Sequence, residues 1–497
     1  MDVELLVLRH HVRRWHLALV EELTSAGVGV RMTPQPSGRT WEPDLEALLG
    51  RERRLHHLVG RGATLVSPDQ VPDLPGGRHV RDTPAPEVRI DLTGGAPRPG
   101  CWQVTFDAEP GEDSAARAVL ATRFPVVRVI DGAGEVRAEG RPGSEQPGVA
   151  AAALDDVLAG CVQLVRAAVT GHRLRLPEAT DGTGQDGHHR VPPTPTQVWV
   201  RDVALTPVRA AYHQAYRSPH WRVGWRWLDG PGLLERGALP DDGWQRLPDD
   251  GRHFYADPFP IVVGGRTYLF VEDVDHRIGR GVISVTEIGV DGPSSVPRPV
   301  LESTVHLSYP VVVEDAGDLW MVPETSGARR VELYRATRFP DEWVLDRVLL
   351  DDVDANDATP FRHQGRWWLS ATVRRGGSCS DALHLWHAPT LRGPWQPHRR
   401  NPVLVDIASA RPAGRPEVHD GRLLRPAQDG SRRYGGGLTV AEVVELSPDA
   451  FAQRVVARVG PGPAWPGHCL HTVNRAGRLE VIDGSARSFR LASRSRP

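Results

Sequence analysis

The sequence predicts two unlike parts, a Rossmann-like α/β domain followed by a five-bladed β-propeller. Strand-like and helix-like runs alternate in the first part, 11 of the 15 tryptophans lie from Trp221 onward, and one hairpin pattern recurs five times in the second part. We place the α/β domain at residues 1–175, a linker and connecting segment at 176–220, and the propeller at 221–497.

The first part alternates apolar strand-like runs with helix-like runs, which is typical of α/β domains. The strand-like runs are residues 4–8, 28–32, 88–92 and 126–130, and the helix-like runs are 11–25 and 149–169. No GxGxxG motif follows the first strand, so no dinucleotide site is predicted. Residues 174–197 are rich in Gly, Pro, Thr and His, which indicates a linker or a long exposed loop.

The second part repeats a unit of two strands joined at a glycine turn. The turn glycines are Gly265, Gly317, Gly365, Gly421 and Gly477, which lie 48 to 56 residues apart. A period of about 50 residues is typical of a four-stranded propeller blade. Residues 221–497 are long enough for five such blades. A β-sandwich whose hairpins share this spacing by coincidence is the alternative.

The composition indicates a folded protein without a dominant charge. Of the 497 residues, 40% are hydrophobic and 25% are charged, close to the average of globular proteins. The formal net charge is -2, so we expect no nucleic-acid binding and no attraction to anionic lipid. The sequence shows no signal peptide and no apolar run of about 18 residues, so we expect no membrane insertion.

All 60 basic residues are arginine, which is typical of a GC-rich bacterial genome. Without lysine, the chain cannot form a Schiff base, anchor pyridoxal phosphate or build a phosphate-loop site. The four cysteines lie far apart with no CxxC pair, so neither a disulfide framework nor a structural zinc site is predicted. We therefore expect a cytoplasmic protein, and the sequence identifies no cofactor and no protein partner.

The repeat brings residues of different blades to equivalent positions. In an antiparallel hairpin, the residue eight before the turn glycine and the residue seven after it lie at the same end. The first position holds Asp257, Tyr309, Asp357, Ala413 and Cys469, and the second holds Glu272, Glu324, Thr372, Gln428 and Gly484, with Asp483 one residue earlier. If the first strand of each hairpin lines the channel, four carboxylates converge at one channel mouth: Asp257, Glu272, Glu324 and Asp357.

Crowded carboxylates can supply an acid and a base at the same pH. Like charges disfavour simultaneous ionisation, so at least one pKa rises. Cleavage of a glycosidic bond needs such a pair. Each carboxylate also has a structural alternative: Asp257 precedes a proline, as turn starters do, Asp357 ends an acidic loop, and Glu324 ends a strand where salt bridges are common.

Residues of the fourth and fifth units suggest contacts with a carbohydrate or a sugar phosphate. In the fourth unit they are Arg411, Arg415, Arg425, Gln428 and Asp429. Arginine suits phosphate or carboxylate, and Gln with Asp suits sugar hydroxyls; a salt-bridge network is the alternative. In the fifth unit, His471 can meet a substrate hydroxyl or a cation, and Asp483 lies at the same end. The HxxH of His468 and His471 lacks a third ligand, so no metal site is predicted.

The second part resembles the five-bladed propeller at the N-terminus of glucosamine inositolphosphorylceramide transferase, which is similar to family 43 glycoside hydrolases and to the arabinanase, levansucrase and invertase group. The resemblance rests on ADPF, MVPE, GRWWL, RPAGRP, RPAQD, HTVN and VIDG, within residues 222–484. It implies that Asp257 is the general base and that Asp357 tunes the pKa of the acid. No glutamate matches the family acid, since Glu417 lies beside RPAGRP; Glu324 is the substitute we expect.

The first part resembles a formyltransferase-type α/β domain through its opening strand and helix and the segment IDLTGGAPRPGCWQVTFD. Such enzymes use an Asn, His and Asp set and an HPSLLP-like loop, and neither is found in this sequence. The resemblance therefore implies a degenerate relative that serves binding or assembly.

Three hypotheses follow, and the sequence favours the first. The propeller cleaves or transfers a glycosyl group, with Asp257 as base, Glu324 as acid and Asp357 as electrostatic tuner. Alternatively, it binds a glycan or sugar phosphate without chemistry. The third possibility is a folate-dependent transferase activity in the first domain.

Overall fold

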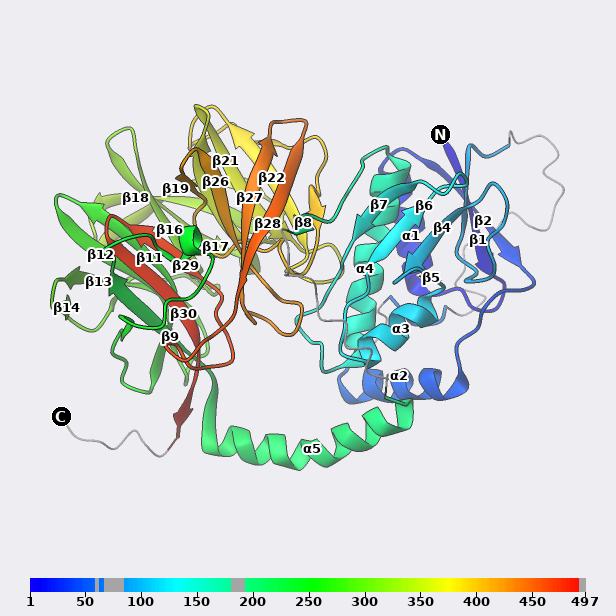
Figure 1. Ribbon diagram of the computed structural model, residues 1–497, viewed down its shortest axis with the longest axis horizontal. Coiled ribbons are helices and arrows are strands. Elements are labelled where there is room, and N and C mark those ends of the chain that lie inside the picture. The colour runs from blue at the N-terminus through cyan, green and yellow to red at the C-terminus, as the bar shows by residue number, and fades with distance from the viewer. Residues whose placement is uncertain (59–61, 67–84, 180–192, 491–497) are drawn as a thin grey trace.

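The computed structural model describes residues 1–58, 62–66, 85–179 and 193–490. Figure 1 shows the propeller at one end of the molecule and the α/β domain at the other. Helix α5 (Pro195–Ala215) runs along one side between them. The two predicted parts therefore lie at opposite ends of the molecule.

A mixed β-sheet forms the centre of the first domain, in the order β2-β1-β3-β4-β6-β7. Its strands are β1 (Asp2–Leu8), β2 (Gly29–Gln35), β3 (Val88–Asp91), β4 (Trp102–Phe106), β6 (Val127–Ile130) and β7 (Val136–Gly140), with the short β5 (Glu109–Pro110) beside β4. The strands β2, β1, β3 and β4 are parallel to one another, whereas β6 is antiparallel to β4 and β7 is antiparallel to β6. The first domain therefore has the α/β composition that the sequence predicts, with a mixed sheet. The Rossmann-like arrangement stays a prediction.

Four helices accompany this sheet: α1 (Arg14–Ser25), α2 (Pro43–Leu55), α3 (Glu112–Leu120) and α4 (Ala150–Val169). Helix α4 contacts the other three helices and also β6 and β7. On its far side, Ala159 and Asp156 meet the propeller loop at Gly377. Because α4 is enclosed on both sides, nearly all of its residues are buried, and small alanines allow the close approach.

The second part is a five-bladed propeller, as predicted, since five separate sheets of at least four strands follow one another. The first three blades are β11–β15 (His253–Val263, Arg266–Asp275, Gly281–Gly289, Gly292–Pro293, Arg298–Leu301), β16–β19 (Ser308–Asp315, Asp318–Thr325, Arg330–Arg338, Glu342–Asp351) and β20–β24 (Ala355–His363, Arg366–Val373, Ala382–Ala388, Gln396–Pro397, Leu404–Val405). The fourth blade is β25–β28 (Glu417–His419, Arg422–Gln428, Leu438–Leu446, Phe451–Val459), extended by β8 (Glu178–Ala179).

The fifth blade closes the ring with both ends of the propeller sequence. Its order is β10-β9-β30-β29, so β9 (Tyr216–Trp227) and β10 (Gln245–Arg246) pair with the last hairpin, β29 (Val473–Ala476) and β30 (Leu479–Phe489). Backbone hydrogen bonds between the first and last strands hold the circle together, so no blade edge is left open there.

The turn glycines and the inner strands lie where the repeat predicts. All five turn glycines have positive φ, between 57° and 85°. The first strand of each hairpin lies at one edge of its sheet, and β11 contacts both β16 and β29. These first strands are therefore the innermost strands around the channel.

Three inner strands contain the same irregularity. Asp257, Tyr309 and Asp357 have φ of 48°, 47° and 53°, and the pairing register shifts beside each of them. This left-handed conformation is strained for residues other than glycine and is concentrated at functional sites. The irregular residue is the one eight positions before the turn glycine, so the spacing that singled out the two aspartates also marks a shared backbone feature.

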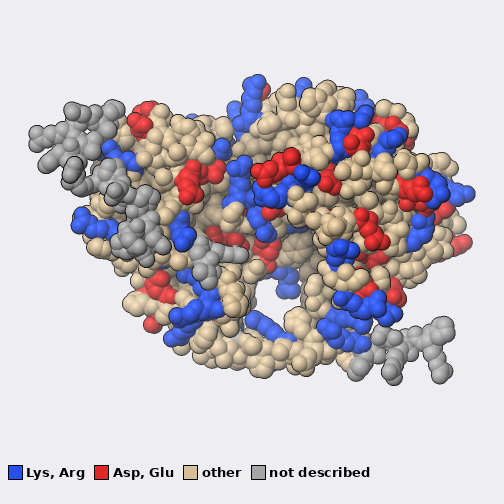
Figure 2. Space-filling model, turned by 180° about the vertical axis from the view of Figure 1, so that it is seen from behind, with Lys and Arg blue, Asp and Glu red and all other residues tan. Residues whose placement is uncertain are grey.

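The two domains are joined by polar contacts through the loop after β7. Asp381 accepts a hydrogen bond from the backbone N–H of Gly143 at 3.0 Å. Glu145 accepts from the Ser378 hydroxyl at 2.6 Å and from the backbone N–H of Cys379 at 3.2 Å. Figure 2 shows, from behind, an opening bounded by the two domains and the connecting helix, with acidic and basic side chains at its rim.

The connecting segment contains a helix that its Pro- and Gly-rich flank did not predict. Thr194 caps α5 by accepting from the backbone N–H of Gln197, and Pro195 occupies the first helical position. Short helices α6 (Leu233–Arg236) and η2 (Ser326–Ala328) complete the described elements. Within the described part of the chain, no helix has the length and apolar character needed to cross a membrane.

Candidate functional site at the channel mouth

Most of the predicted site residues meet at one end of the channel. Asp257 and Asp357 lie on β11 and β20, the inner strands of the first and third blades. Glu272 and Glu324 lie on the neighbouring strands β12 and β17, and Asp483 lies on β30. The charge of Asp257 acts on Asp357, Glu272 and Asp483, and that of Glu324 acts on Asp357. The structure thus brings together carboxylates that are more than 200 residues apart in sequence.

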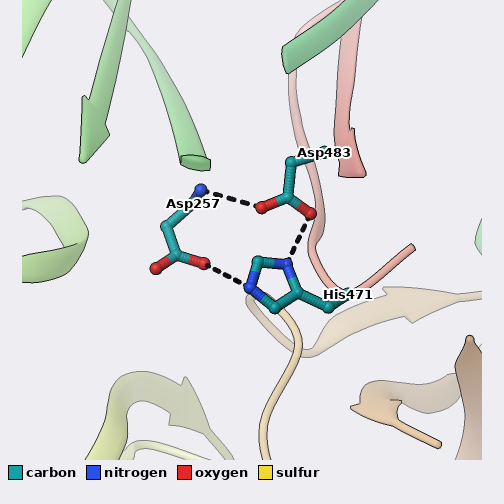
Figure 3. A group of neighbouring side chains, drawn as sticks. All are labelled: Asp257, His471 and Asp483. Carbon is teal, nitrogen blue, oxygen red and sulfur yellow. Dashed lines mark hydrogen bonds and ion pairs between the residues drawn. The ribbon is translucent and has the colours of Figure 1, made fainter. Parts of the chain in front are cut away.

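Asp257, His471 and Asp483 form one hydrogen-bonded group, shown in Figure 3. The backbone N–H of Asp257 donates to Asp483 Oδ2 at 2.9 Å, and His471 Nδ1 lies 2.7 Å from Asp483 Oδ1. His471 Nε2 lies 3.7 Å from Asp257 Oδ1, which also accepts from the Thr472 hydroxyl at 2.9 Å. The imidazole stacks on Trp221 with ring centroids 4.1 Å apart, so its orientation is fixed on several sides.

This group combines a raised carboxyl pKa with a raised imidazole pKa. Burial raises the pKa of Asp257 well above its ordinary value, against the influence of His471, and Asp483 adds to the rise. Burial alone lowers the pKa of His471, but the carboxylates of Asp483 and Asp257 outweigh it and raise that pKa to about 9. At neutral pH the imidazole is therefore a cation between two acids.

The same three residues could also hold a metal by distance alone, because their ligand atoms lie within 4.8 Å of one another. However, His471 Nδ1 and Asp483 Oδ1 already face each other, and the imidazolium itself supplies a positive charge. A metal would have to replace these hydrogen bonds, so we assign no metal to the group.

Asp357 is held by a second set of bonds. Its backbone N–H donates to Glu324 Oε2 at 2.8 Å, as the N–H of Asp257 does to Asp483. Its carboxylate accepts from Arg411 Nε at 2.5 Å and from Gln428 Nε2 at 2.8 Å. Burial raises the pKa of Asp357 to about 7, with Arg411 acting against the rise and Glu324 adding to it.

The carboxylates differ in how fully their oxygens are engaged. Glu324 accepts from the Ser326 hydroxyl on Oε1 and from the Asp357 N–H on Oε2. Both oxygens of Asp357 accept from the Arg411 guanidinium. In Figure 3, by contrast, one oxygen of Asp257 points away from His471 and Asp483. Asp257 is therefore the carboxylate best placed to meet a substrate.

Three residues at the site were not selected from the sequence. His306 Nε2 lies 2.9 Å from Glu272 Oε1, and its side chain is 46% exposed, so it marks the rim of the site. Thr472 bonds Asp257, and Trp221 supports His471. The HTVN motif contains Thr472, and the tryptophan enrichment includes Trp221, whereas no repeat position contains His306.

Three predicted binding residues lie elsewhere. Arg415 donates to the backbone carbonyls of Val312 and Pro260 inside the ring. Arg425 donates to the carbonyl of Ala410 and the amide of Gln453 within the fourth blade. Asp429 accepts from Arg458 at 3.0 Å. These contacts match the alternative of a structural polar network.

A small hollow connects this site to the first domain. It is lined by Arg411, Gln428, Tyr434 and Ser380 of the propeller and by Ser144 and Glu145 of the first domain. Arg411 and Gln428 are the two groups that hold the Asp357 carboxylate. The first domain therefore forms part of the wall beside the channel mouth.

Comparisons with known proteins concern the propeller. Residues 248–475 match the family described as "Glucosamine inositolphosphorylceramide transferase 1, N-terminal". A protein named glucosamine inositolphosphorylceramide transferase 1 from Oryza sativa subsp. japonica is 32% identical over 248 residues, which are 47% of this chain and 33% of the relative. Its namesake from Arabidopsis thaliana is 32% identical over 206 residues, 40% of this chain and 27% of the relative. The chain thus matches about a third of the length of these relatives.

Solved structures share low similarity with this chain. A family 117 glycoside hydrolase from Zobellia galactanivorans is 15% identical with a TM-score of 0.33, covering 49% of this chain and 77% of that one. The RS223 beta-xylosidase is 12% identical with a TM-score of 0.34, covering 50% and 96%. The family match begins at residue 248, so the formyltransferase-like character of the first domain stays a prediction. The chain is thus similar to the N-terminal region of glucosamine inositolphosphorylceramide transferase 1 over its propeller.

Proposed function

We propose that the propeller is a carbohydrate-active site that hydrolyses or transfers a glycosyl group at the channel mouth. The observation that carries this proposal is the pair of buried aspartates, Asp257 and Asp357, whose pKa values are both raised. The pKa of Asp357, raised to about 7, lets this carboxyl exchange a proton near neutral pH, as glycosidic bond cleavage requires, and the raised pKa of Asp257 favours its protonated form. The name of the curated relatives, glucosamine inositolphosphorylceramide transferase 1, supports a sugar substrate.

Asp257 is the proposed proton-transfer group. One of its oxygens faces away from the His471 cluster, while the other is held by Thr472. As a general base, Asp257 must be ionised when it takes up a proton, and the neighbouring imidazolium of His471 favours that form.

Asp357 is the proposed electrostatic tuner, and Glu324 remains the proposed acid. Arg411 and Gln428 hold Asp357 rigidly, so its charge acts on the site from a fixed position. Glu324 can donate a proton only after it releases Ser326 from Oε1. In the proposed step the glycosidic oxygen of the substrate takes the place of the Ser326 hydroxyl at Oε1 and accepts the proton of the Glu324 carboxyl.

Binding without chemistry is the second candidate function. It is favoured by the number of bonds that Asp357 and Glu324 already accept within the protein, because such bonds stabilise the fold as well as a substrate site. In that case the propeller would present a sugar to another protein. The two candidates differ in turnover and in the effect of substituting Asp257.

Turnover assays on the full chain separate the candidates. The panel comprises aryl glycosides, including glucosaminides, and nucleotide sugars with inositol-containing acceptors. Glycosyl chemistry predicts turnover that Asp257→Asn lowers by about 100-fold or more, while Asp429→Asn, a matched change away from the site, leaves it intact. Binding of a panel sugar without turnover, with affinity unchanged by Asp257→Asn, would support the binding role and contradict the catalytic one.

A further inference from the structure

A second hollow lies in the first domain, at a position that favours ligand binding. It is bounded by Leu8 at the end of β1 and by Leu92, Thr93 and Gly94 after β3. The sheet order places β2 on one side of β1 and β3 on the other, so the chain reverses its direction of winding between β1 and β3. In open α/β sheets, ligands bind outside the carboxyl ends of the strands at such a switch point.

The backbone at this hollow is shaped by two glycines. Gly94 and Gly111 have φ of 68° and 92°, and a Cβ added to Gly94 would lie 2.9 Å from the Cα of Gly111. Side chains at these positions would force the two loops apart. Gly111 also precedes helix α3, whose first backbone N–H groups have no partner within the helix and attract negative charge.

Two buried side-chain donors line the hollow without a hydrogen-bond partner among the described residues. His16 is 2% exposed, and its Nδ1 accepts from the backbone N–H of Arg13 at 3.0 Å. Burial and Arg13 lower the pKa of His16 to about 3, so the neutral ring carries its proton on Nε2, the unpartnered atom. Trp41, 7% exposed, likewise has an unpartnered Nε1–H. Buried donors without partners are rare in native proteins.

The charged side chains around the hollow are engaged in ion pairs. Arg39 lines it and bonds Asp113 through Nε at 2.8 Å. Glu112 is the lining carboxylate, and its two oxygens accept from Arg13 and Trp15; the buried Arg13 also bonds a second carboxylate, Glu46. Arg13 in turn lies over the Trp41 ring, 3.6 Å from the centroid. The unpartnered nitrogens of His16 and Trp41 are therefore the donors that remain for an anion, and the unpartnered Nδ1 of His11 donates or accepts according to its tautomer.

We propose that this hollow, in the first domain and separate from the propeller, binds a small molecule through a carboxylate or phosphate group. His16 Nε2–H, Trp41 Nε1–H and Arg39 would donate to its oxygens, next to the N-terminus of α3. The rest of the ligand extends to the open mouth, past Leu8 and Leu92. Binding here would make the first domain a ligand-sensing or substrate-binding unit beside the propeller.

Isothermal titration of the full chain with sodium phosphate and, separately, with sodium acetate tests the proposal. We expect saturable binding of at least one anion, and the stronger of the two identifies the ligand group. Trp41→Phe removes one donor but keeps the ring over Arg13, so the affinity falls about tenfold or more. His16→Asn keeps an acceptor near the Arg13 N–H, removes the Nε2 donor and produces a similar loss.

The controls separate binding from folding and from the propeller. Trp102→Phe, a matched change on β4 away from the hollow, should leave the affinity unchanged, as should Asp257→Asn in the propeller. Thermal unfolding monitored by circular dichroism verifies that each variant is folded. Absence of saturable binding with both anions, or equal affinity of folded Trp41→Phe and the unsubstituted chain, overturns the proposal.

Discussion

Replacing His471 with glutamine tests whether the carboxylate cluster depends on an imidazolium. His471 is buried between Asp483, 2.7 Å from Nδ1, and Asp257, 3.7 Å from Nε2. Glutamine retains polarity but carries no charge at any pH. The variant should therefore lose the part of the stability that comes from the charged ring and keep the rest.

The magnitude follows from the shifted pKa of His471. Its pKa is raised to about 9 in the folded protein from 6.5, so its contribution is fully present below about pH 6.5 and is lost as the pH rises through about 9. The shift of about 2.5 pH units corresponds to at most about 3 kcal/mol. The difference in unfolding free energy between the unsubstituted chain and His471→Gln should shrink by up to that amount across this window.

Urea denaturation of both proteins at a series of pH values measures this difference. His384→Gln is the control, because burial lowers the pKa of His384 to about 3 and keeps that ring neutral. The difference in unfolding free energy between the unsubstituted chain and His384→Gln should stay constant above about pH 6.5 and change only at lower pH. A difference for His471→Gln that is independent of pH, or that grows as the pH rises, would refute the imidazolium assignment.

Two further predictions concern the groups around Asp357, and a third concerns a close approach of the backbone at Gly414. Arg411→Met leaves the buried Asp357 carboxyl without its cation and should lower the unfolding free energy by about 3–5 kcal/mol, and adding Asp357→Asn should restore part of this loss. If the losses of the two single variants simply add in the double variant, the two residues are not paired. Gln428→Leu removes a donor to Asp357, so the carboxyl pKa should rise above about 7, which carbon-13 NMR of labelled aspartate measures; an unchanged pKa would contradict the bond. Gly414→Ala should lower the unfolding free energy by at least about 2 kcal/mol, because φ is 135° and the added Cβ would lie 1.9 Å from the carbonyl oxygen of Val473. The control Gly460→Ala meets no atom within 4 Å and should change thermal stability little, so equal effects of the two substitutions would contradict the close approach at Gly414.

The propeller could be predicted because its sequence pattern repeats at a regular interval. Five glycines at a nearly constant interval specify five hairpins, and the same interval predicted that Asp257 and Asp357 occupy equivalent positions on their strands. The first domain repeats nothing, so strands such as β4 and the antiparallel β7 had no internal template. Helix α5 escaped prediction since its start is set by the local cap of Thr194 beside a proline-rich segment.

The sequence predicted where the candidate site lies better than it predicted which atoms contact one another there. The repeat brings Asp257, Glu324 and Asp357 to one mouth, but it does not specify which oxygens are already bonded. Arg411 and Arg415 lie four residues apart, yet one bonds Asp357 and the other bonds backbone carbonyls, because neighbouring residues on this irregular segment face different blades. His306 and Glu145 reach the site region from loops outside the repeat. Such contacts depend on tertiary packing and have no sequence period.

A crystal structure with a bound saccharide from the assay panel tests the central claim most directly. The account predicts a sugar ring at the channel mouth, with a hydroxyl or the glycosidic oxygen within hydrogen-bond distance of the outward-facing oxygen of Asp257, and loss of that sugar in crystals of Asp257→Asn or a clear change in its pose. A saccharide bound outside the mouth, with Asp257, Asp357 and His471 still bonded only to protein atoms, would contradict it.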